Sequence, residues 1–376
     1  MPPSRVGIPA SQQAVIQNAD GECIIVQDAR VPKLRSGNIL VKTMAVALNP
    51  TDFKMGSAFP VPGAIVGIDY VGEVILIDDQ AARVRPDLRV GDFVCGGVHG
   101  NNPADLDSGC FAEYVTAPAD LVLRAPADVP LAQAAALGTG LTTACMVLNS
   151  FGIDFDVALS ASPTSGAEAP VLIYGASTAS GTMAIQLLKL AGFDPIGICS
   201  PHNFDMVKSY GASAVFDYKN AEVAEDVKKH TKFEISHALA CITNEASITC
   251  CEAAMGTSGG HLVLLEDFEE EWKTRDDVSV DFVLALEAFG NEVRLPGDYY
   301  RAANSEKHEM VVRGFAALQP LLDQGIIRSH PTEVVGYDFG CILEGMEQLG
   351  MGMVSGKKLT VVFEGRDLQK TQNERV

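Results

Sequence analysis

Positive charge is scarce in this sequence. Its 376 residues include 28 Lys and Arg against 48 Asp and Glu, which gives a formal net charge of -20 at pH 7. Because affinity for a nucleic-acid backbone is supplied largely by Lys and Arg, this balance argues against a nucleic-acid partner. It would also weakly repel an anionic cofactor, so any phosphate site must depend on local backbone geometry.

The sequence also lacks paired cysteines, a signal peptide and a membrane-spanning run. Nine cysteines are scattered without a CxxC pair, which is typical of small buried thiols. Residues 1–11 show neither the charged start nor the apolar core of a signal peptide, and we expect no apolar stretch of membrane-spanning length. These absences predict a cytoplasmic protein with no membrane partner.

The chain is long enough for two domains, and its pattern changes along its length. Residues 14–115 form short runs bounded by Gly, Pro and Asp, which predict a strand-rich, barrel-like part. Helical spacing over residues 131–148 predicts a helix or a helix pair. We expect an exposed loop at residues 151–170 and a polar tail at residues 366–376.

From residue 171 to residue 265, short strands alternate with helices, and this order predicts a parallel, doubly wound sheet. The expected strands are residues 171–174, 195–199, 214–216, 237–240 and 260–265. After them, a helix ending at Asp323 and a strand at residues 359–363 are expected to rejoin the first domain.

A glycine-rich turn follows the strand at residues 171–174. Gly175 begins the run Gly-Ala-Ser-Thr-Ala-Ser-Gly, and an apolar helix starts at its end. Glycine allows the tight turn, and the small residues let backbone N–H groups approach a pyrophosphate at the helix N-terminus. Thr178 replaces the middle glycine of the usual fingerprint. Close packing of a helix on a sheet is the alternative reason for small residues, but the repeated strand-helix units favour a dinucleotide.

The segment after the second of these strands indicates which dinucleotide binds. An acidic residue at this place would bond the ribose 2′-hydroxyl of NADH. Here residues 199–203 read Cys-Ser-Pro-His-Asn, and the first carboxylate is Asp205. Neutral donors suit a 2′-phosphate, so the sequence predicts NADPH; an ordinary polar loop is the alternative.

Several motifs that are weak singly become specific through their order and spacing. They are Asn-Pro-Thr-Asp at 49–52, Gly-Ile-Asp-Tyr-Val-Gly-Glu-Val at 67–74, Val-Gly-Asp-Phe-Val at 90–94, Gly-Cys-Phe-Ala-Glu-Tyr-Val at 109–115 and the Gly175 turn. Through them nearly the whole chain resembles the medium-chain dehydrogenase/reductase superfamily. The resemblance implies an α/β fold with a GroES-like catalytic domain at residues 1–144 and 290–376, a Rossmann domain with a doubly wound parallel sheet at residues 145–289, and an active site in the cleft between them.

Zinc-dependent members of this superfamily place Cys, His and Cys ligands where this chain has Asn49, Ile68 and Thr139. A tetrahedral zinc site cannot be assembled from these side chains. The four-Cys lobe that holds a structural zinc is also missing, because Cys95 and Cys110 are the only cysteines in that stretch. We therefore expect no metal, and no alcohol oxidation through zinc.

A narrower resemblance is carried by Leu-Asn-Pro-Thr-Asp-Phe-Lys-Met at 48–55, Cys-Ser-Pro-His-Asn-Phe-Asp at 199–205, Phe-Asp-Tyr at 216–218, Cys-Ile-Thr-Asn at 241–244 and Ser-Gly-Lys-Lys-Leu at 355–359. These segments resemble the trans-acting enoyl reductases of fungal polyketide biosynthesis. That likeness implies NADPH-dependent reduction of the α,β-double bond of thioesters carried by a polyketide synthase or a polyketide synthase–nonribosomal peptide synthetase hybrid. A free-standing quinone or enone reductase and a catalytically silent NADPH-binding partner are the alternatives. The oligomeric state stays open, a monomer included.

The same resemblance implies a residue set for each ligand. Residues 200–203 and Tyr218 would hold the adenosine end, residues 177–180 the pyrophosphate, and residues 51–54 with Leu265 and Ser355 the nicotinamide side. The implied cofactor residues are Thr51, Asp52, Phe53, Lys54, Gly175, Ser177, Thr178, Ala179, Ser180, Ser200, Pro201, His202, Asn203, Tyr218, Leu265, Glu266, Val354 and Ser355. The implied substrate residues are Ala144, Cys145, Met146, Val147, Leu148, Phe151, Ala285, Leu286, Ala288 and Phe289.

Two side chains are the candidate catalytic residues. Lys54 could donate a hydrogen bond to the thioester oxygen or to the cofactor ribose, and a solvated surface lysine is the alternative. Thr143 would present its hydroxyl to the nicotinamide amide or the substrate by resemblance, or else bond its own helix backbone. Asp52 is expected to cap the turn that follows it, with orientation of Lys54 as the alternative. Asp69 is expected to be structural, and His99 to be a loop histidine rather than an acid.

Overall fold

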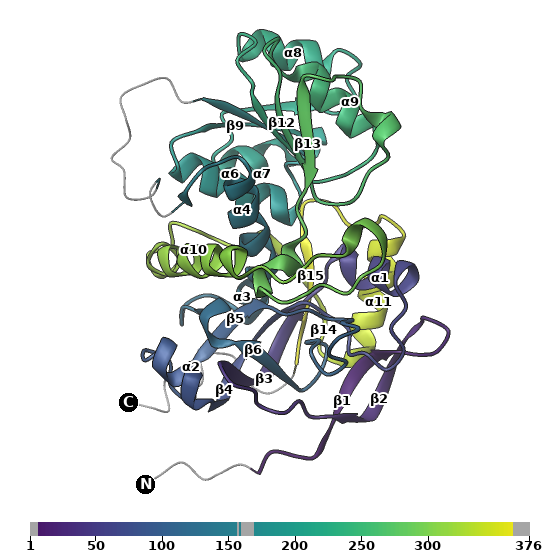
Figure 1. Ribbon diagram of the computed structural model, residues 1–376, viewed down its shortest axis with the longest axis vertical. Coiled ribbons are helices and arrows are strands. Elements are labelled where there is room, and N and C mark those ends of the chain that lie inside the picture. The colour runs from purple at the N-terminus through teal and green to yellow at the C-terminus, as the bar shows by residue number, and fades with distance from the viewer. Residues whose placement is uncertain (1–6, 156–157, 159–168, 364–376) are drawn as a thin grey trace. The chain divides into compact units, whose positions relative to one another are not determined.

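Two units make up the computed structural model, which describes residues 7–155, 158 and 169–363 (Figure 1). Unit 1 comprises Met1–Gly138, Thr332–Met353 and Leu359–Val376, and unit 2 comprises Thr139–Pro331 and Val354–Lys358. Most of the expected loop at residues 151–170 and the whole tail at residues 366–376 lie outside the described residues.

The units differ from the expected domains mainly at residues 290–331. These residues were expected in the GroES-like domain. In the structure they pack on unit 2, where helix α10 (Ser305–Asp323) lies against the 3₁₀ turn η4 (Ala285–Phe289). The ammonium of Lys307 on α10 lies 2.6 Å from the carboxylate of Glu287 in η4. The remaining differences are residues 139–144 and 354–358, which also belong to unit 2.

A six-stranded sheet forms the centre of unit 2. Its strands follow the order β10-β9-β8-β11-β12-β13, and every neighbouring pair is parallel. The chain starts at a middle strand, builds one half outward and then builds the other, which is the doubly wound order. The prediction of a parallel, doubly wound sheet is therefore confirmed. The strands are β8 (Pro170–Tyr174), β9 (Asp194–Cys199), β10 (Ala214–Asp217), β11 (His237–Ala240), β12 (Gly260–Leu264) and β13 (Val278–Phe282).

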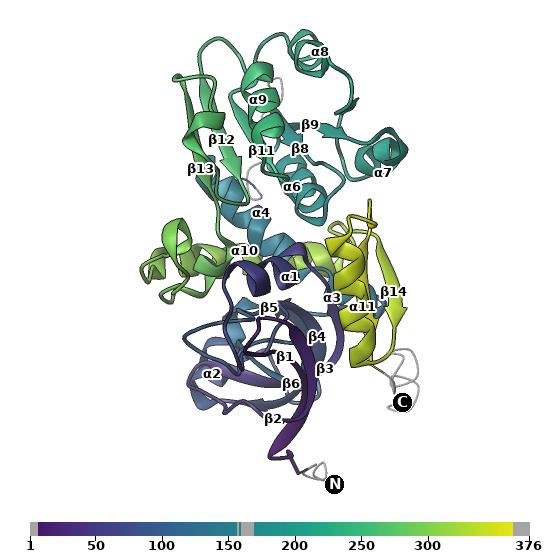
Figure 2. The ribbon, with the colours of Figure 1, turned by 90° about the vertical axis from the view of Figure 1, so that its right-hand side faces the viewer.

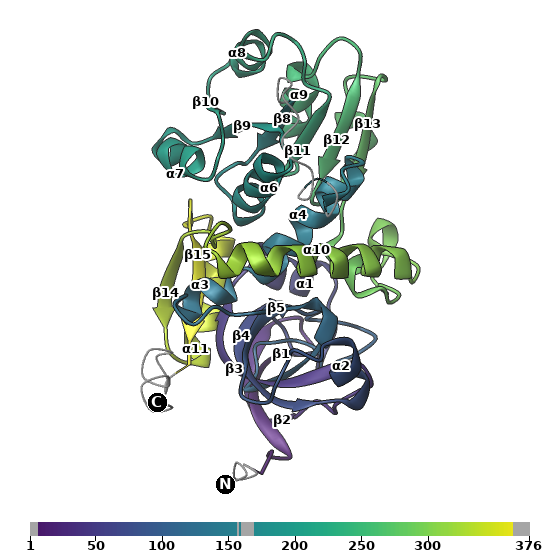
Figure 3. The ribbon, with the colours of Figure 1, turned by 90° about the vertical axis from the view of Figure 1, so that its left-hand side faces the viewer.

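Helices of unit 2 bury their apolar sides on this sheet. In α6 the residues from 181 to 188 are all buried. Val223 and Val227 of α8 share one apolar core with Ile248 and Cys251 of α9. Helices α8 and α9 pack together, as Figures 2 and 3 show from opposite sides. The helices are α4 (Gly138–Ser150), α6 (Ala179–Leu190), α7 (Phe204–Ser209), α8 (Val223–His230), α9 (Glu245–Ala254) and α10.

One apolar helical segment among the described residues, Leu131–Ser150, is long enough to cross a membrane, which corrects the expectation that there is none. It comprises α3 (Leu131–Ala135) and α4. Of its most apolar window, 89% is buried inside the protein. A segment with this burial is a core helix, because a membrane span would present its apolar surface to lipid.

Unit 1 is built from antiparallel strands and uses both ends of the chain. Strand β3 (Asn38–Ala47) pairs with β4, β6 and β15, so the expected return of the strand near residue 359 to the first part is confirmed. Helix α11 packs near α1, a contact visible in Figure 2. The other elements are β1 (Ser11–Gln17), β2 (Cys23–Arg30), α1 (Pro50–Ala58), β4 (Asp69–Ile77), α2 (Asp79–Val84), β5 (Phe93–Gly97), β6 (Tyr114–Pro118), β7 (Val122–Arg124), β14 (Thr332–Gly336), α11 (Phe339–Gly350) and β15 (Lys358–Val362).

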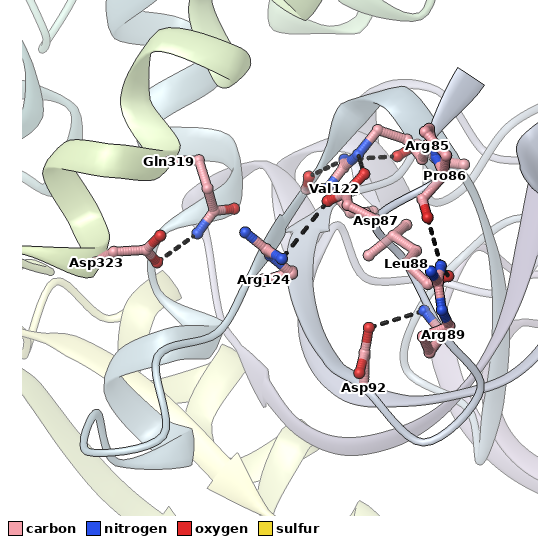
Figure 4. A network of polar contacts seen from close by, with 11 residues as sticks. Arg85, Pro86, Asp87, Leu88, Arg89, Asp92, Val122, Arg124, Gln319 and Asp323 are labelled. Carbon is pink, nitrogen blue, oxygen red and sulfur yellow. Dashed lines mark hydrogen bonds and ion pairs between the residues drawn. The ribbon is translucent and has the colours of Figure 1, made fainter. Parts of the chain in front are cut away.

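A guanidinium network fastens the end of α2 to β7 (Figure 4). Arg85 bonds the two carboxylate oxygens of Asp87 at 2.9 and 3.0 Å and the carbonyl oxygens of Ala119 and Val122 at 3.0 and 2.9 Å. Arg124 lies 3.8 Å from the same carboxylate. The hydrogen bond from Arg85 holds the pKa of Asp87 below its usual value.

Candidate active site

The carboxyl ends of the parallel strands gather the predicted cofactor residues at one edge of the unit 2 sheet. Gly175 follows β8, residues 200–203 follow β9, Tyr218 follows β10, and Leu265 and Glu266 follow β12. In open α/β sheets a ligand binds outside this edge, where the strand order reverses. The reversal lies between β8 and β11, so Gly175 stands at the switch point.

The turn after β8 fits a pyrophosphate. Gly175 has φ +76°, and a Cβ there would lie 3.2 Å from atoms of Cys241 and Ile242, so only glycine suits this position. The hydroxyl of Thr178 caps α6 by accepting a hydrogen bond from the Gly181 N–H at 3.0 Å. Residues 177–180 are partly exposed, so the N-terminus of a helix of 12 residues is open to an anion.

The loop after β9 contacts the segment that contains Ser355. The Ser355 hydroxyl lies 3.1 Å from His202 Nε2 and accepts a hydrogen bond from Asn203 Nδ2 at 3.1 Å. A Cβ on Gly356 would lie 2.3 Å from the side-chain amide oxygen Oδ1 of Asn203, so the two segments pack closely. The resemblance implies a place for Ser355 on the nicotinamide side, and this stays a prediction; in the structure its hydroxyl contacts the loop predicted for the adenosine end.

Lys219 and the segment after β11 are absent from the predicted site. The ammonium of Lys219 lies 5.7 Å from the ring centroid of Tyr218, a side chain that is 42% exposed. Lys219 therefore puts a positive charge at the end of β10. Cys241 and Ile242 contact the glycine turn, and the hydroxyl of Thr243 is buried without a partner among the described residues. Their position directly after a strand was the available signal.

Helix α1 presents the candidate cation of unit 1. Asp52 is 2% exposed, and its carboxylate accepts a hydrogen bond from the Asn49 N–H at 2.7 Å, so the expected cap is present. Lys54 is exposed two residues further along, while Thr51 and Phe53 are partly buried. The cap fixes the start of α1 and with it the position from which Lys54 extends.

The zinc-ligand places of the superfamily do not fit a metal here. Asn49 Nδ2 donates a hydrogen bond to the fully buried carboxylate of Asp69 at 2.9 Å, which gives Asp69 a structural role. Ile68 is 7% exposed and apolar, and Thr139 offers a neutral hydroxyl. In the part of the chain that the structure describes, no three His, Cys, Asp or Glu residues are grouped to hold a metal ion.

His99 is buried in unit 1, as a structural histidine would be. Burial lowers its pKa to about 4, and nearby Asp105 opposes this shift. At neutral pH the imidazole therefore carries no charge and cannot act as an imidazolium acid.

The predicted substrate residues of α4 do not all lie near the glycine turn. Thr143 is 6% exposed, and Phe151 follows the end of the helix. The Phe151 ring lies 5.0 Å from the ring of His237 and 5.9 Å from that of His261, at the amino ends of β11 and β12. A strand of this length spans about 13 Å, so Phe151 and Gly175 stand at opposite edges of the sheet. The role of Phe151 in a substrate channel stays a prediction.

A pocket of about 120 Å³ opens beside the second half of α4. Cys145 is the predicted substrate residue that lines it. Its walls are Cys145, Asn149, Gly152, Ile153, Asp154, Phe155, Met310, Arg313 and Gly314.

Turn η4 carries the second group of predicted substrate residues and follows β13, at the same edge as Gly175. Ala288 is fully buried. Glu287 is anchored between Lys307 at 2.6 Å and Arg301 at 3.5 Å, and this arrangement fixes the turn that carries Ala285 and Phe289.

Comparisons with known proteins agree with this architecture. Residues 35–127 match the family described as alcohol dehydrogenase GroES-like domain, and residues 179–265 match the family described as zinc-binding dehydrogenase. The chain is 41% identical to trans-enoyl reductase poxP of Penicillium oxalicum over 97% of this chain and 96% of the relative. It is also 41% identical to trans-enoyl reductase caaB of Aspergillus niger, over 96% and 99%. The chain belongs to the trans-enoyl reductases.

This trans-enoyl reductase has the predicted medium-chain dehydrogenase/reductase fold, a GroES-like domain with a Rossmann domain. A putative zinc-dependent alcohol dehydrogenase of Rhizobium etli CFN 42 shares that fold with a TM-score of 0.75 at 21% identity, over 96% of this chain and 100% of that protein. The predicted enzyme class, an enoyl-reducing oxidoreductase, is confirmed. Enoyl reductases of this superfamily use a nicotinamide cofactor, and the residues around Gly175 fit one.

Proposed function

We propose that this enzyme uses NADPH to reduce the α,β-double bond of polyketide thioesters that remain attached to a carrier. It would act in the cytoplasm, in trans to a polyketide synthase or a polyketide synthase–nonribosomal peptide synthetase hybrid. The full-length identity of 41% to named trans-enoyl reductases is the observation that supports this proposal most directly.

The preference for NADPH over NADH rests on the loop after β9. The loop after β9 has no carboxylate before Asp205, and His202 and Asn203, both in contact with Ser355, offer hydrogen-bond donors. Neutral donors can bond a 2′-phosphate, whereas a carboxylate would repel it. Lys219, beside the ring of Tyr218, adds a cation that favours the same phosphate.

The cofactor would be held along the carboxyl edge of the sheet. Residues 177–180 would bind the pyrophosphate at the N-terminus of α6, and residues 200–203 with Ser355 would bind the adenosine end. When bound, the nicotinamide supplies the hydride, and the protein supplies position and electrostatics.

Lys54 and Thr143 are the proposed catalytic residues. Negative charge develops on the thioester oxygen when a hydride adds to the β-carbon, and a hydrogen bond from an ammonium stabilises that charge. We assign this donor to Lys54, which is exposed on α1, and a supporting hydrogen bond to the Thr143 hydroxyl. Since no side chain among the described residues emerges as the acid for the α-carbon, water would supply that proton.

NADPH oxidation with a panel of 2-enoyl thioesters tests the proposal. We expect turnover of carrier-attached and simple thioesters, and a fall of about ten- to hundredfold in kcat/KM for Lys54→Ala. Lys42→Ala is the matched control, because Lys42 is an exposed lysine on β3 of the same unit. Turnover of quinones without thioester reduction would favour a free-standing quinone reductase. NADPH binding without turnover of any acceptor would favour a silent partner. Equal activity of Lys54→Ala and the parent would remove the role of Lys54 alone.

A further inference from the structure

Two cysteines flank the glycine turn of unit 2. Cys199 is the last residue of β9 and Cys241 directly follows β11, while β8 lies between these two strands. The turn that begins at Gly175 therefore has one thiol on each side. Neither cysteine belongs to the residue set predicted for the cofactor.

Cys241 packs against the turn and lies next to its capping residue. A Cβ on Gly175 would lie 3.2 Å from Cys241 Cβ, so the thiol-bearing residue is in close contact with the bend. The Thr178 side chain also lies next to the Cys241 thiol and opposes the rise of its pKa that burial causes. Because the Thr178 oxygen accepts from the Gly181 N–H at 3.0 Å, its own proton is available for the sulfur. Cys241 thus lies against both the bend and the residue that caps α6.

Cys199 joins the turn to the next loop. The Ser177 side chain lies next to the Cys199 thiol and opposes the rise of its pKa that burial causes. That thiol in turn lies 3.5 Å from the carbonyl oxygen of Ser200 and donates to it. Ser177 belongs to the segment proposed for the pyrophosphate, and Ser200 begins the segment proposed for the adenosine end. One side chain that is 4% exposed therefore connects the two halves of the proposed cofactor site.

We propose that Cys199 and Cys241 are positioning residues for the nicotinamide cofactor, with Cys199 setting the spacing between the pyrophosphate turn and the adenosine loop. This inference rests on the proposed cofactor site. Both residues act through Ser177, Thr178 and Ser200 and need no contact with the cofactor.

A thiol suits this place because it remains neutral. Burial raises the pKa of Cys199 to about 11 and that of Cys241 to about 12. At the pH of the cytoplasm both sulfurs therefore keep their protons. Each can accept a hydrogen bond from a hydroxyl without placing a negative charge next to the phosphates. A carboxylate there could accept from the hydroxyls but could not donate to the Ser200 carbonyl oxygen, and its charge would repel the ligand.

The test is cofactor binding by Cys199→Ala, Cys199→Ser and the parent. We expect the alanine variant to raise the Kd and KM for NADPH about three- to tenfold, the value of one hydrogen bond, with kcat unchanged. Serine keeps a donor and an acceptor of similar size, so it should restore most of the affinity. Cys251→Ala is the matched control, because Cys251 is a fully buried cysteine of the same unit without a contact to the turn among the described contacts.

A second measurement separates positioning from plain packing. If Cys199 acts through Ser177, then Ser177→Ala and Cys199→Ala should not be additive in the Kd for NADPH, and the double variant should resemble either single one. Additive effects would overturn the inference, and so would a Cys199→Ala variant that melts earlier but binds NADPH as the parent does. A parent that binds no nicotinamide nucleotide at all would instead overturn the proposed function.

Discussion

The buried imidazole of His330 makes the stability of this enzyme depend on pH. His330 is 1% exposed, and its Nδ1 lies 3.0 Å from the Thr182 hydroxyl. Burial, and then the nearby Lys358, lower the pKa of His330 to about 3. The unfolded chain takes up this proton near pH 6.5, whereas the folded protein does not until the pH is far lower. Stability is therefore lost as the pH falls from about 6.5 toward 3.

The predicted consequence is measurable by urea unfolding at pH 7 and pH 5. Between these values His330 should account for about 2 kcal/mol of the loss in unfolding free energy, because each pH unit below 6.5 contributes about 1.4 kcal/mol. His330→Gln cannot take up a proton and should remove that part of the pH dependence. His230→Gln, at an exposed position, should leave it unchanged. The same pH dependence in His330→Gln and the parent would contradict this assignment.

Individual residues were predictable where their partners lie nearby in the sequence. The cap formed by Asp52 with Asn49 involves residues three apart, and it was expected from the motif alone. Nothing in the sequence shows that Ser355 contacts His202 and Asn203, about 150 positions earlier. Such a contact depends on the return of the chain to unit 2, which local patterns do not encode.

At the scale of elements, the turn between β8 and α6 gives the sharpest test of the cofactor site. Gly175→Ala places a Cβ on a residue with φ +76° and 3.2 Å from Cys241 and Ile242, so the bend must move. We expect the Kd for NADPH to rise at least about tenfold, since the strain of about 1–2 kcal/mol falls on the phosphate-binding backbone.

Gly192→Ala is its matched control. Gly192 has a similar φ of +83°, but a Cβ there would meet nothing within 4 Å. Both variants should lose about 1 kcal/mol of stability through backbone strain, and only the Gly175 variant should lose cofactor affinity. Equal NADPH affinities in the two variants, measured by fluorescence titration, would show that this turn does not hold the cofactor.

Elements with a clear hydrophobic period were predicted closely, and those that depend on packing were missed. The strand expected at residues 237–240 is β11 (His237–Ala240), and the strand expected at 195–199 is β9 with one more residue. Helix α11 was not predicted, because it contains Gly340, Gly345 and Gly350, and glycine disfavours helix in isolation. A Cβ on Gly345 would lie 2.4 Å from the Leu48 side chain, so the fold requires glycine here. The same glycine makes the helix hard to predict from the sequence.

For the whole molecule, the family and the two-part architecture followed from motifs spread along the chain, whereas the assignment of residues 290–331 did not. Those residues have no strand-helix rhythm, and their contacts within unit 2 include the ion pairs of the buried Glu287 with Lys307 and Arg301. A buried carboxylate with two cationic partners forms only when the chain folds. In the sequence, these charged residues resemble those of an exposed helix with mixed charges, so the contact was not predicted.

The preference for NADPH over NADH can be tested on the whole chain by thermal unfolding in the presence of each nucleotide. A ligand at about 100 times its Kd stabilises the folded state by about 2.7 kcal/mol, which raises the melting temperature by about 5–10 °C for units of this size. NADPH should reach this shift at concentrations where NADH gives much less, because in the proposed site the loop after β9 has no carboxylate before Asp205 and Lys219 adds a positive charge at the end of β10.

The shift from NADPH should persist in EDTA, since the residues at the zinc-ligand places do not suit a metal. Ser355→Ala should narrow the difference between the two nucleotides, because His202 and Asn203 then lose the hydroxyl that fixes them. Lys42→Ala, which changes an exposed lysine of unit 1, should leave that difference as in the parent. A larger shift with NADH than with NADPH would mean that the loop after β9 bonds a ribose hydroxyl. In place of a carboxylate, a water molecule or a backbone carbonyl oxygen would then have to accept the hydrogen bond from that hydroxyl.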